Sequence, residues 1–331
     1  ELLNFIETVL NGLMSGVMYS LVALGFVLIF KASGVFNFAQ GVFALFAALT
    51  LVGFQTGQIP FSHLINELFG TNLHNWYPSL HSFLAILLTI VTMIILAWLV
   101  ERLVLRHLVN QEPIILFMAT IGLAFVLEGV GDLMWGSDVK VLDVGIPSGG
   151  SIWLEEATIG WASEGSEYYG MYIDVLNVWA TIIAVILVTA LALFSQYTKT
   201  GRALRAVADD HQAALSVGIS LRSIWILVWG ISGFIAMVAG IMWGTESGVQ
   251  FSLSLIALKA LPVLILGGFT SIPGAIIGGL LIGVGEKLAE IYIGGLLDIG
   301  AIENWFAYVL ALVFLLFRPQ GLFGDKIIER V

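Results

Sequence analysis

Long apolar runs recur throughout this chain, and they restrict its fold more than any other feature. A helix needs about 20 apolar residues to cross the hydrocarbon core of a bilayer, and several runs here reach about 18 residues or more. Of the 331 residues, 59% are hydrophobic and only 11% are charged, and the mean hydropathy is +1.00. The runs lack the two-residue alternation of outer-membrane barrel strands. The sequence therefore predicts an all-α polytopic membrane protein with a single transmembrane domain over residues 1–331.

The apolar runs predict about eight transmembrane helices. Two regions, near 31–41 and 257–288, mix apolar residues with Gly, Pro or polar residues, as broken or re-entrant segments of transporters do. For 31–41, a tight turn between spans and a broken helix both fit. For 257–288, two short halves joined at a Gly/Pro turn fit better than one helix. The more regular runs lie at 3–30, 42–54, 81–100, 113–135, 175–197, 223–243 and 305–317.

The basic residues predict the orientation in the membrane, because cytoplasmic loops carry an excess of Lys and Arg. The segment 55–80 and the acidic loop 136–172 are then expected to face outward, with the amino end outside. The loop 136–172 is too short to bury a core of its own. We expect the first apolar run to be a retained span, because no basic n-region and cleavage site mark it as a signal peptide. The predicted cytoplasmic residues are Arg102, Arg106, Lys199, Arg202, Arg205, Arg222, Arg318, Lys326 and Arg330.

A polar stretch at residues 198–220 separates two of the apolar runs and reads TKTGRALRAVADDHQAALSVGIS. A short amphipathic helix is expected after Gly201. Asp209 or Asp210 can serve as the N-cap of a second short helix, and Gly218 stands where a helix normally ends. Because this stretch is predicted to be cytoplasmic, we expect a cytoplasmic partner to hold the helix pair.

Ionisable residues inside apolar runs are candidates for a transport role, because an unpaired charge in hydrocarbon costs at least a few kcal/mol. Glu128, Lys259 and Glu246 occupy such positions, and Asp132 follows Glu128 in the same run. A structural role fits equally well. Lys259 can extend to the outer interface or pair with a carboxylate, and Glu128 can pair with a polar group of a neighbouring helix.

The glycines of the 257–288 region predict close helix packing. Gly274 and Gly278, like Gly279 and Gly283, are four residues apart and form a smooth stripe on a helix. A packing role is favoured over substrate contact, although a sliding interface in a transporter also needs small residues. The residues predicted to pack are Gly267, Gly268, Gly274, Gly278, Gly279 and Gly283, and those predicted to line a polar path are Asn37, Gln40, Thr270, Glu128 and Lys259.

Signatures of catalytic or metal chemistry are missing from the sequence. It contains no Cys, and its five His residues show no metal-binding spacing. GVGEKL at 283–288 lacks the first half and the hydroxyl residue of a P-loop, and no GxSxG motif occurs. We expect no cofactor or enzymatic activity in this chain. The net charge of −10 comes from acidic residues in loops, including Glu155 and Glu156, and does not indicate a nucleic-acid partner.

The sequence QAALSVG at 212–218 resembles the EAA-xxx-G loop of ABC importer permeases, with Gln212 in place of the usual acid. The wider chain resembles the branched-chain amino acid permease family. The matching segments are GLMSGVMYSLVALGFVLIF (12–30), GVFNFAQG (34–41), GRALRAVADDHQAALSVGI (201–219), LGGFTSIPGAIIGGLLIG (266–283) and FRPQGLFG (317–324). The segments 55–80 and 136–172 look longer than in the compact version of the family.

The resemblance implies a membrane subunit of an ATP-driven importer in a bacterial cytoplasmic membrane. Its cargo would be branched-chain amino acids or a related small polar solute such as urea or amides. Two cytoplasmic ATPases would bind ATP and Mg, a second related permease chain would share the path, and a periplasmic or extracellular binding protein would deliver the solute. Membrane lipid would surround the chain. Residues implied in ATPase coupling are Gly201, Arg202, Arg205, Asp209, Asp210, Gln212, Ala213, Ala214 and Gly218.

An alternative hypothesis is a stand-alone, ion-coupled secondary transporter. It would use Glu128, Asp132 or Lys259 to bind the coupling ion. The polar helix pair at 198–220 argues against it, because a solitary carrier does not need such an element. A third hypothesis, an intramembrane enzyme, lacks any nucleophile–base or metal constellation in the sequence.

Overall fold

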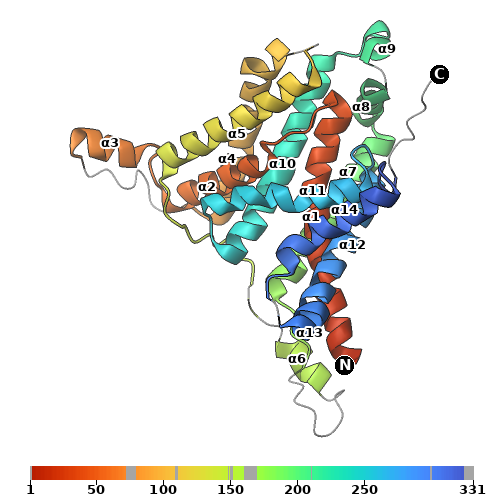
Figure 1. Ribbon diagram of the computed structural model, residues 1–331. Helices are drawn as coiled ribbons and strands as arrows, with labels where there is room; N and C mark the ends of the chain where they lie inside the picture. Colours follow the sequence, from red (N-terminus) through yellow and green to blue (C-terminus); the bar gives the residue numbers. More distant parts are fainter. Residues whose placement is uncertain are drawn as a thin grey trace, which may run out of the picture. The chain divides into compact units, whose positions relative to one another are not determined.

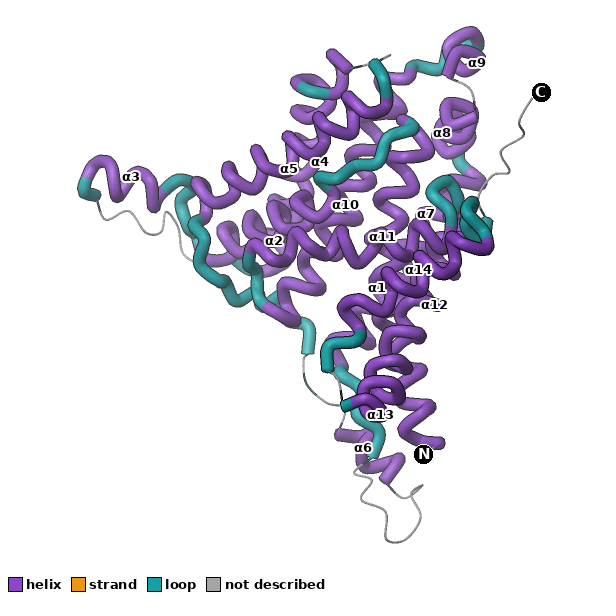
Figure 2. Tube along the Cα trace, in the orientation of Figure 1, coloured by secondary structure: helices purple, strands orange, loops and turns teal. Residues whose placement is uncertain are grey.

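The computed structural model describes residues 2–71, 80–108, 111–147, 149, 152–159, 170–209, 211–298 and 300–323. Helices account for the regular secondary structure within these ranges, as Figure 2 shows. The β-pairing in the described part of the chain is one isolated antiparallel bridge between Lys140 and Val249. The predicted all-α polytopic fold is confirmed.

Six helices of the described chain are long and apolar enough to cross a membrane, and they make this a multi-pass membrane protein. Three shorter apolar segments accompany them. The predicted total of about eight spans therefore stays a prediction. The six are α1 (Leu2–Ser33), α4 (Ser82–Leu103, continued by η1, Leu105–Leu108), α5 (Pro113–Trp135), α7 (Val175–Tyr197), α10 (Leu221–Ser247) and α12 (Ile272–Leu288, continued by η3, Ala289–Gly294, and α13, Gly295–Leu297). The shorter segments are α2 (Gln40–Thr56), η2 with α11 (Phe251–Leu255 and Ile256–Gly267) and α14 (Glu303–Phe317).

The remaining helices lie between these apolar segments. The short α3 spans Ser62–Phe69, and α6 spans Ile152–Ile159 within the loop predicted to face outward. In that loop the amide of Met171 donates to the Thr158 hydroxyl at 2.6 Å. The polar stretch contains two helices, α8 (Lys199–Asp209) and α9 (His211–Ser216).

The chain forms two compact units. Unit 1 contains Glu1–Leu24, Ile146–Ala190 and Lys259–Val331. Unit 2 contains Gly25–Gly145 and Leu191–Leu258. The division falls within α1, α7 and α11, so each of these helices runs from one unit into the other.

Unit 2 is built around α2, which packs against α4, α5, α10 and η2 (Figure 1). Every residue of α2 from Gln40 to Gly53 is buried. Glycines allow this close packing. A side chain at Gly41 would overlap the carbonyl oxygen of Ser254, and one at Gly240 of α10 would overlap the carbonyl oxygen of Ala44. The hydrophobic run at 40–56 is therefore the core of this unit, although it is too short to be counted as a clear span.

In unit 1 the first half of α1 packs against α12 through glycines on both helices. A Cβ on Gly12 would lie 2.7 Å from the Cα of Val284, and one on Gly16 would lie 2.8 Å from the Cα of Leu280. Gly279 and Gly283 present their backbone to the same part of α1. Small residues on both surfaces let the two backbones approach within van der Waals contact.

The two interruptions read from the sequence are present in the structure. Helix α1 ends at Ser33, Gly34 has φ of +69°, and α2 begins at Gln40. In the second region α11 ends at Gly267 and α12 begins at Ile272, so the prediction of two halves is confirmed.

The link between the two halves follows from its local chemistry. Gly268 has φ of +103°, which a residue with a side chain rarely adopts. The Ser271 hydroxyl accepts from the amide of Gly274 at 3.0 Å and caps α12. Gly267 and Gly274 face each other so closely that a Cβ on either would overlap the other's carbonyl. A Cβ added at Gly278 would likewise lie only 2.7 Å from the carbonyl oxygen of Val263.

Candidate functional site

The α8–α9 pair, residues 199–216, is an amphipathic element between the apolar helices α7 and α10 (Figure 1). Along α8, Gly201, Leu204 and Val207 are buried and recur at helical spacing. Arg202 is exposed on another face of the helix. Both α8 and α9 contact α10. The buried stripe holds α8 against the rest of unit 2 and leaves its polar face available to a partner.

The start of α8 differs from the sequence prediction, which placed the helix after Gly201. Helix α8 begins at Lys199, because the Thr198 hydroxyl accepts from the amide of Gly201 at 2.9 Å and caps the helix earlier. Gly201 therefore lies inside the first turn. A side chain there would overlap the carbonyl oxygen of Phe194 in the last turns of α7. This glycine is required by close packing and not by a helix start.

The second helix ends where the sequence predicted. Gly218 has φ of +85°, and its amide donates to the carbonyl of Leu215 at 3.0 Å. The amide of Ile219 donates to the carbonyl of Ala214 at 3.0 Å, which closes the end of α9. Asp209 is the last residue of α8 and α9 begins at His211, while Asp210, the other predicted N-cap, lies outside the described residues.

The surface of α9 is unusual for a polar loop because it exposes apolar side chains. Leu215 is 53% exposed and Val217, directly after the helix, is 75% exposed, while Ala214 is buried. Gln212 and Ala213, from the motif that resembles the permease loop, are also exposed. In α8, the partly exposed Arg205 donates to the carbonyl of Gln196 at 3.3 Å. Exposed apolar side chains together with an exposed arginine, Arg202, are typical of a protein-binding surface.

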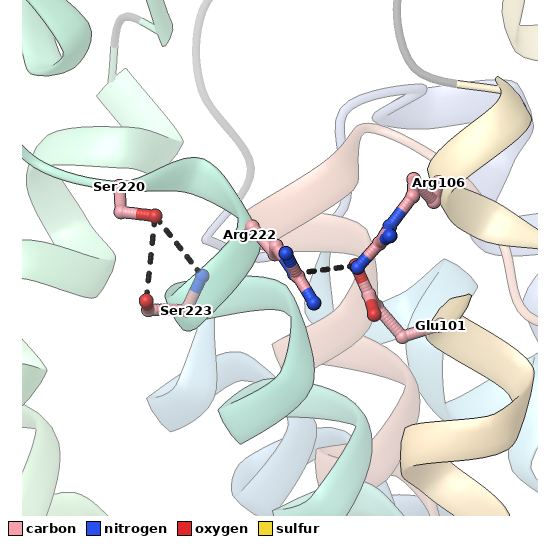
Figure 3. A network of polar contacts seen from close by, with 5 residues as sticks. All are labelled: Glu101, Arg106, Ser220, Arg222 and Ser223. Atoms are coloured by element: carbon pink, nitrogen blue, oxygen red, sulfur yellow. Dashed lines mark hydrogen bonds and ion pairs between the residues drawn. The ribbon is translucent and has the colours of Figure 1, made fainter.

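A buried carboxylate near the start of α10 was not predicted from the sequence. Glu101, in the last turn of α4, is only 2% exposed. Its Oε1 lies 3.7 Å from Nε of Arg222 and 3.9 Å from Nε of Arg106. Figure 3 shows the two arginines approaching Glu101 from different elements, Arg222 from α10 and Arg106 from η1. Ser220, also in this view, caps α10 by accepting from the amide of Ser223 at 3.4 Å.

The two polar residues of the first interruption lie together inside unit 2. Asn37 is 0% exposed and Gln40 is 1% exposed. The Ser232 hydroxyl of α10 donates to Gln40 Oε1 at 2.7 Å, and Gln40 Nε2 donates to the Ser232 carbonyl at 3.1 Å. Asn37 Nδ2 lies 3.4 Å from Gln40 Oε1, and the carbonyl of Gly25 lies 3.2 Å from the Ser232 hydroxyl. The network closes the break between α1 and α2, and lining of a path by these residues stays a prediction.

The predicted intramembrane acids of unit 2 occupy less buried positions. Glu128 of α5 is half-buried, and Asp132, one turn later, is exposed. Glu246, near the end of α10, is also exposed. Their role in translocation is not tested by this geometry.

Lys259 lies in unit 1 beside a second buried acid that the sequence analysis missed. Its Nζ is 5.9 Å from the centre of the Tyr19 ring, and its charge interacts with Glu286 of α12. Glu286 is 2% exposed and also has a side-chain hydrogen bond with Tyr19. This electrostatic interaction is in line with the structural alternative in which Lys259 pairs with a carboxylate, and that pairing stays a prediction. A lone acid directly after the glycine-rich run 274–285 was the available signal.

The last predicted residues lie around the link between α11 and α12. Thr270 is half-buried in this link. Farther along α12, Lys287 pairs with Glu303 of α14 at 2.8 Å. Glu290 accepts from the amides of Ala301 and Glu303 at 3.0 and 2.9 Å. These contacts join α12, η3 and α14 within unit 1.

Comparison with known proteins finds a family that matches most of the chain. The family described as "Branched-chain amino acid transport system / permease component" matches residues 8–318. The chain belongs to this family. The permease is 28% identical to the "High-affinity branched-chain amino acid transport system permease protein LivH" of Escherichia coli (strain K12), over 100% of this chain and 99% of that protein. It is 26% identical to the corresponding protein BraD of Pseudomonas aeruginosa, again over 100% of this chain and 99% of the relative.

One solved structure, titled "PsaBC from Streptococcus pneumoniae in complex with Fab", matches 97% of each chain with a TM-score of 0.46 and 12% identity. The family match confirms the resemblance read from the sequence. This permease is therefore a membrane transport component and not an enzyme.

Proposed function

We propose that this permease is the transmembrane subunit of an ATP-driven importer and that it carries branched-chain amino acids or a related small polar solute. The proposed cargo rests on the full-length relatives, whose names describe branched-chain amino acid transport. The coupling role rests on one structural observation. The α8–α9 pair carries exposed arginine and apolar side chains between two candidate spans, and its buried face contacts α10.

The α8–α9 pair is the proposed seat of the cytoplasmic ATPases. Two ATPase subunits would bind ATP and Mg, since the sequence of this chain has no P-loop. The exposed Leu215 and Val217 supply apolar contact, and Arg202 and Arg205 supply charge complementarity. The full set proposed for coupling is Gly201, Arg202, Arg205, Asp209, Asp210, Gln212, Ala213, Ala214 and Gly218.

The rest of the proposed assembly follows from the family. A second, related permease chain would complete the path, and a binding protein would deliver the solute to the outward segments 55–80 and 136–172. The complex would reside in a bacterial cytoplasmic membrane. We propose about eight spans in this chain, in which the short α2 and the α11–α12 pair supplement the long helices. Asn37, Gln40, Glu128, Lys259 and Thr270 remain the proposed path residues.

The alternative of a stand-alone, ion-coupled carrier has weaker support. The family groups permease components of transport systems, which favours a chain that works with partners. Lys259 is only half-buried and interacts electrostatically with Glu286, so its position needs no coupling ion to explain it.

Purification from the native membrane in mild detergent tests the proposed assembly. Mass analysis should recover one or two P-loop ATPases and a second permease with this chain. Substitution of both exposed apolar residues at the end of α9, Leu215→Ser with Val217→Ser, should reduce recovery of the ATPases. The matched control Leu68→Ser with Phe69→Ser changes two apolar residues at the end of α3 that are also more than half exposed. Recovery of the unmodified chain alone would contradict the proposal.

A further inference from the structure

Glu101 is an acid in an unusual position for a helix that faces lipid or solvent over much of its length. Many apolar side chains of α4, from Phe83 to Leu103, are exposed, yet Glu101 in its last turn is 2% exposed. Removing a carboxylate from water is costly unless cations and hydrogen bonds compensate. We therefore expect the buried charge of Glu101 to have a specific function.

The compensation that Glu101 receives is incomplete and shared. Both arginine contacts reach the same oxygen, Oε1, at 3.7 and 3.9 Å. A charge-assisted hydrogen bond between these groups is typically about 2.7–2.9 Å long. The second oxygen, Oε2, is buried and has no hydrogen-bond partner among the described residues. The carboxylate thus attracts Arg106 and Arg222 without being locked to either.

Arg222 connects this carboxylate to the α8–α9 pair. It is the second residue of α10, and Gly218, where α9 terminates, lies only four positions earlier. Ser220 caps α10 between them, so the link is short and fixed by hydrogen bonds at both ends. A displacement of α9 must therefore move the first turn of α10, and Arg222 with it.

Arg106 and α10 extend the connection into the core of unit 2. Arg106 lies in η1, which continues α4 and also contacts α5. Helix α10 packs along both α4 and α2, and its Ser232 is bonded to Gln40 of α2. The first turn of α10 and the last turn of α4 are the two elements that Glu101 holds together.

We propose that Glu101 is a positioning residue for coupling: its charge holds the start of α10 and the end of α4 together, so that both follow the α8–α9 pair. The inference rests on the proposed role of that pair in an ATP-driven importer. A neutral side chain of the same size would release both arginines. Movement of the α8–α9 pair would then displace α10, but α4 would no longer move with it.

The test uses the complete transporter, with its ATPases and binding protein, reconstituted in liposomes. Glu101→Gln should lower the amount of solute transported per ATP hydrolysed by on the order of fivefold or more, the range of typical coupling between sites. ATP hydrolysis itself should continue. Glu101→Asp, which keeps the charge, should recover part of this ratio. The matched control Glu112→Gln neutralises an exposed acid before α5 and should leave the ratio at the wild-type value.

A mutant cycle that combines changes at Glu101 with changes at its two arginine partners makes the test specific to these contacts. Arg222→Gln alone should lower the same ratio, and this exposed side chain can be changed even where Glu101→Gln fails to fold. With both Arg106 and Arg222 changed to Gln, a further Glu101→Gln should have no additional effect on coupling. If the ratio of solute transported to ATP hydrolysed is unchanged in Glu101→Gln and in Arg222→Gln, even where both rates fall together, the inference is overturned. If the wild-type complex shows no ATP-dependent uptake, the proposed function is overturned, and with it the basis of the inference about Glu101.

Discussion

The contact between α1 and α12 gives the sharpest stability prediction. Gly283 is surrounded by backbone atoms of α1, and a Cβ there would lie 2.5 Å from the Cα of Gly16, with the Gly12 carbonyl and the Gly16 amide nearer still. Backbone atoms cannot rotate away as side chains can. Gly283→Ala therefore forces the two helices apart by roughly 1 Å, because protein interiors are close-packed.

The expected cost is about 1–3 kcal/mol, the usual range for overpacking in a packed core. For a protein of this size that corresponds to a loss of several degrees, since about 1 kcal/mol shifts the Tm of a domain by about 2–4 °C. The assay is the fraction of monodisperse protein that remains after heating in detergent, followed by size-exclusion chromatography. The melting temperature of Gly283→Ala should lie clearly below that of the unmodified permease.

Gly230 of α10 provides the matched control, because no atom lies within 4 Å of a Cβ added there. Gly230→Ala should keep or slightly raise the melting temperature, by the helix propensity of about 0.5–1 kcal/mol that Ala gains over Gly. If Gly283→Ala melts at the wild-type temperature while Gly230→Ala behaves as expected, the close packing of α1 on α12 is refuted.

Three further predictions follow from other parts of the chain. Ser232→Ala should lower stability by about 1–3 kcal/mol, because it leaves the buried Gln40 without its hydroxyl partner, and thermal melting checks this. Arg202→Glu with Arg205→Glu should abolish ATP-driven uptake while ATP hydrolysis persists, as measured in liposomes. Burial lowers the pKa of Lys140 below its ordinary value of 10.5, and the smaller effect of the nearby Asp138, which raises the pKa, does not cancel this. The unfolded chain then binds this proton more readily, so stability should rise with pH between the lowered pKa and 10.5, and Lys140→Gln should remove that rise.

Each of these predictions has its own control. Ser247→Ala removes an exposed hydroxyl of the same helix and should leave the melting temperature unchanged, so an equal loss in both variants would contradict the role of Ser232. Arg318→Glu reverses an exposed charge outside the α8–α9 pair and should preserve uptake. Coupled transport in the Arg202 and Arg205 variant would contradict the coupling surface. A pH profile that is identical with and without Lys140 would show that its burial has no effect on stability.

The regular helices could be predicted closely because their ends carry local signals. The predicted bounds 113–135 and 175–197 coincide with α5 and α7, where Pro113 opens one apolar run and polar residues flank both. The break at 268–271 was also predictable, since Gly and Pro interrupt the pattern. At Gly201 the same logic failed, because the cap on Thr198 and the contact with α7 outweighed the usual place of a glycine.

Tertiary contacts explain what the sequence could not reveal. Glu101 looked like one charge among the arginines at the end of an apolar run, and its burial depends on Arg222, which is distant in sequence. Glu286 and Lys259 meet only because α11 and α12 fold back on each other. The glycine spacing of α12 predicted a packing stripe, but the spacing alone could not show that α1 lies against it.

ATP-driven uptake by the reconstituted complex tests the central claim most directly. The measurement is accumulation of labelled leucine in liposomes that contain this permease, its partner permease and the two ATPases, with the binding protein outside. The account predicts uptake that requires both ATP and the binding protein, and that is lost in the Arg202→Glu, Arg205→Glu variant while hydrolysis continues. Uptake by this chain alone, driven by an ion gradient and indifferent to ATP, would contradict it.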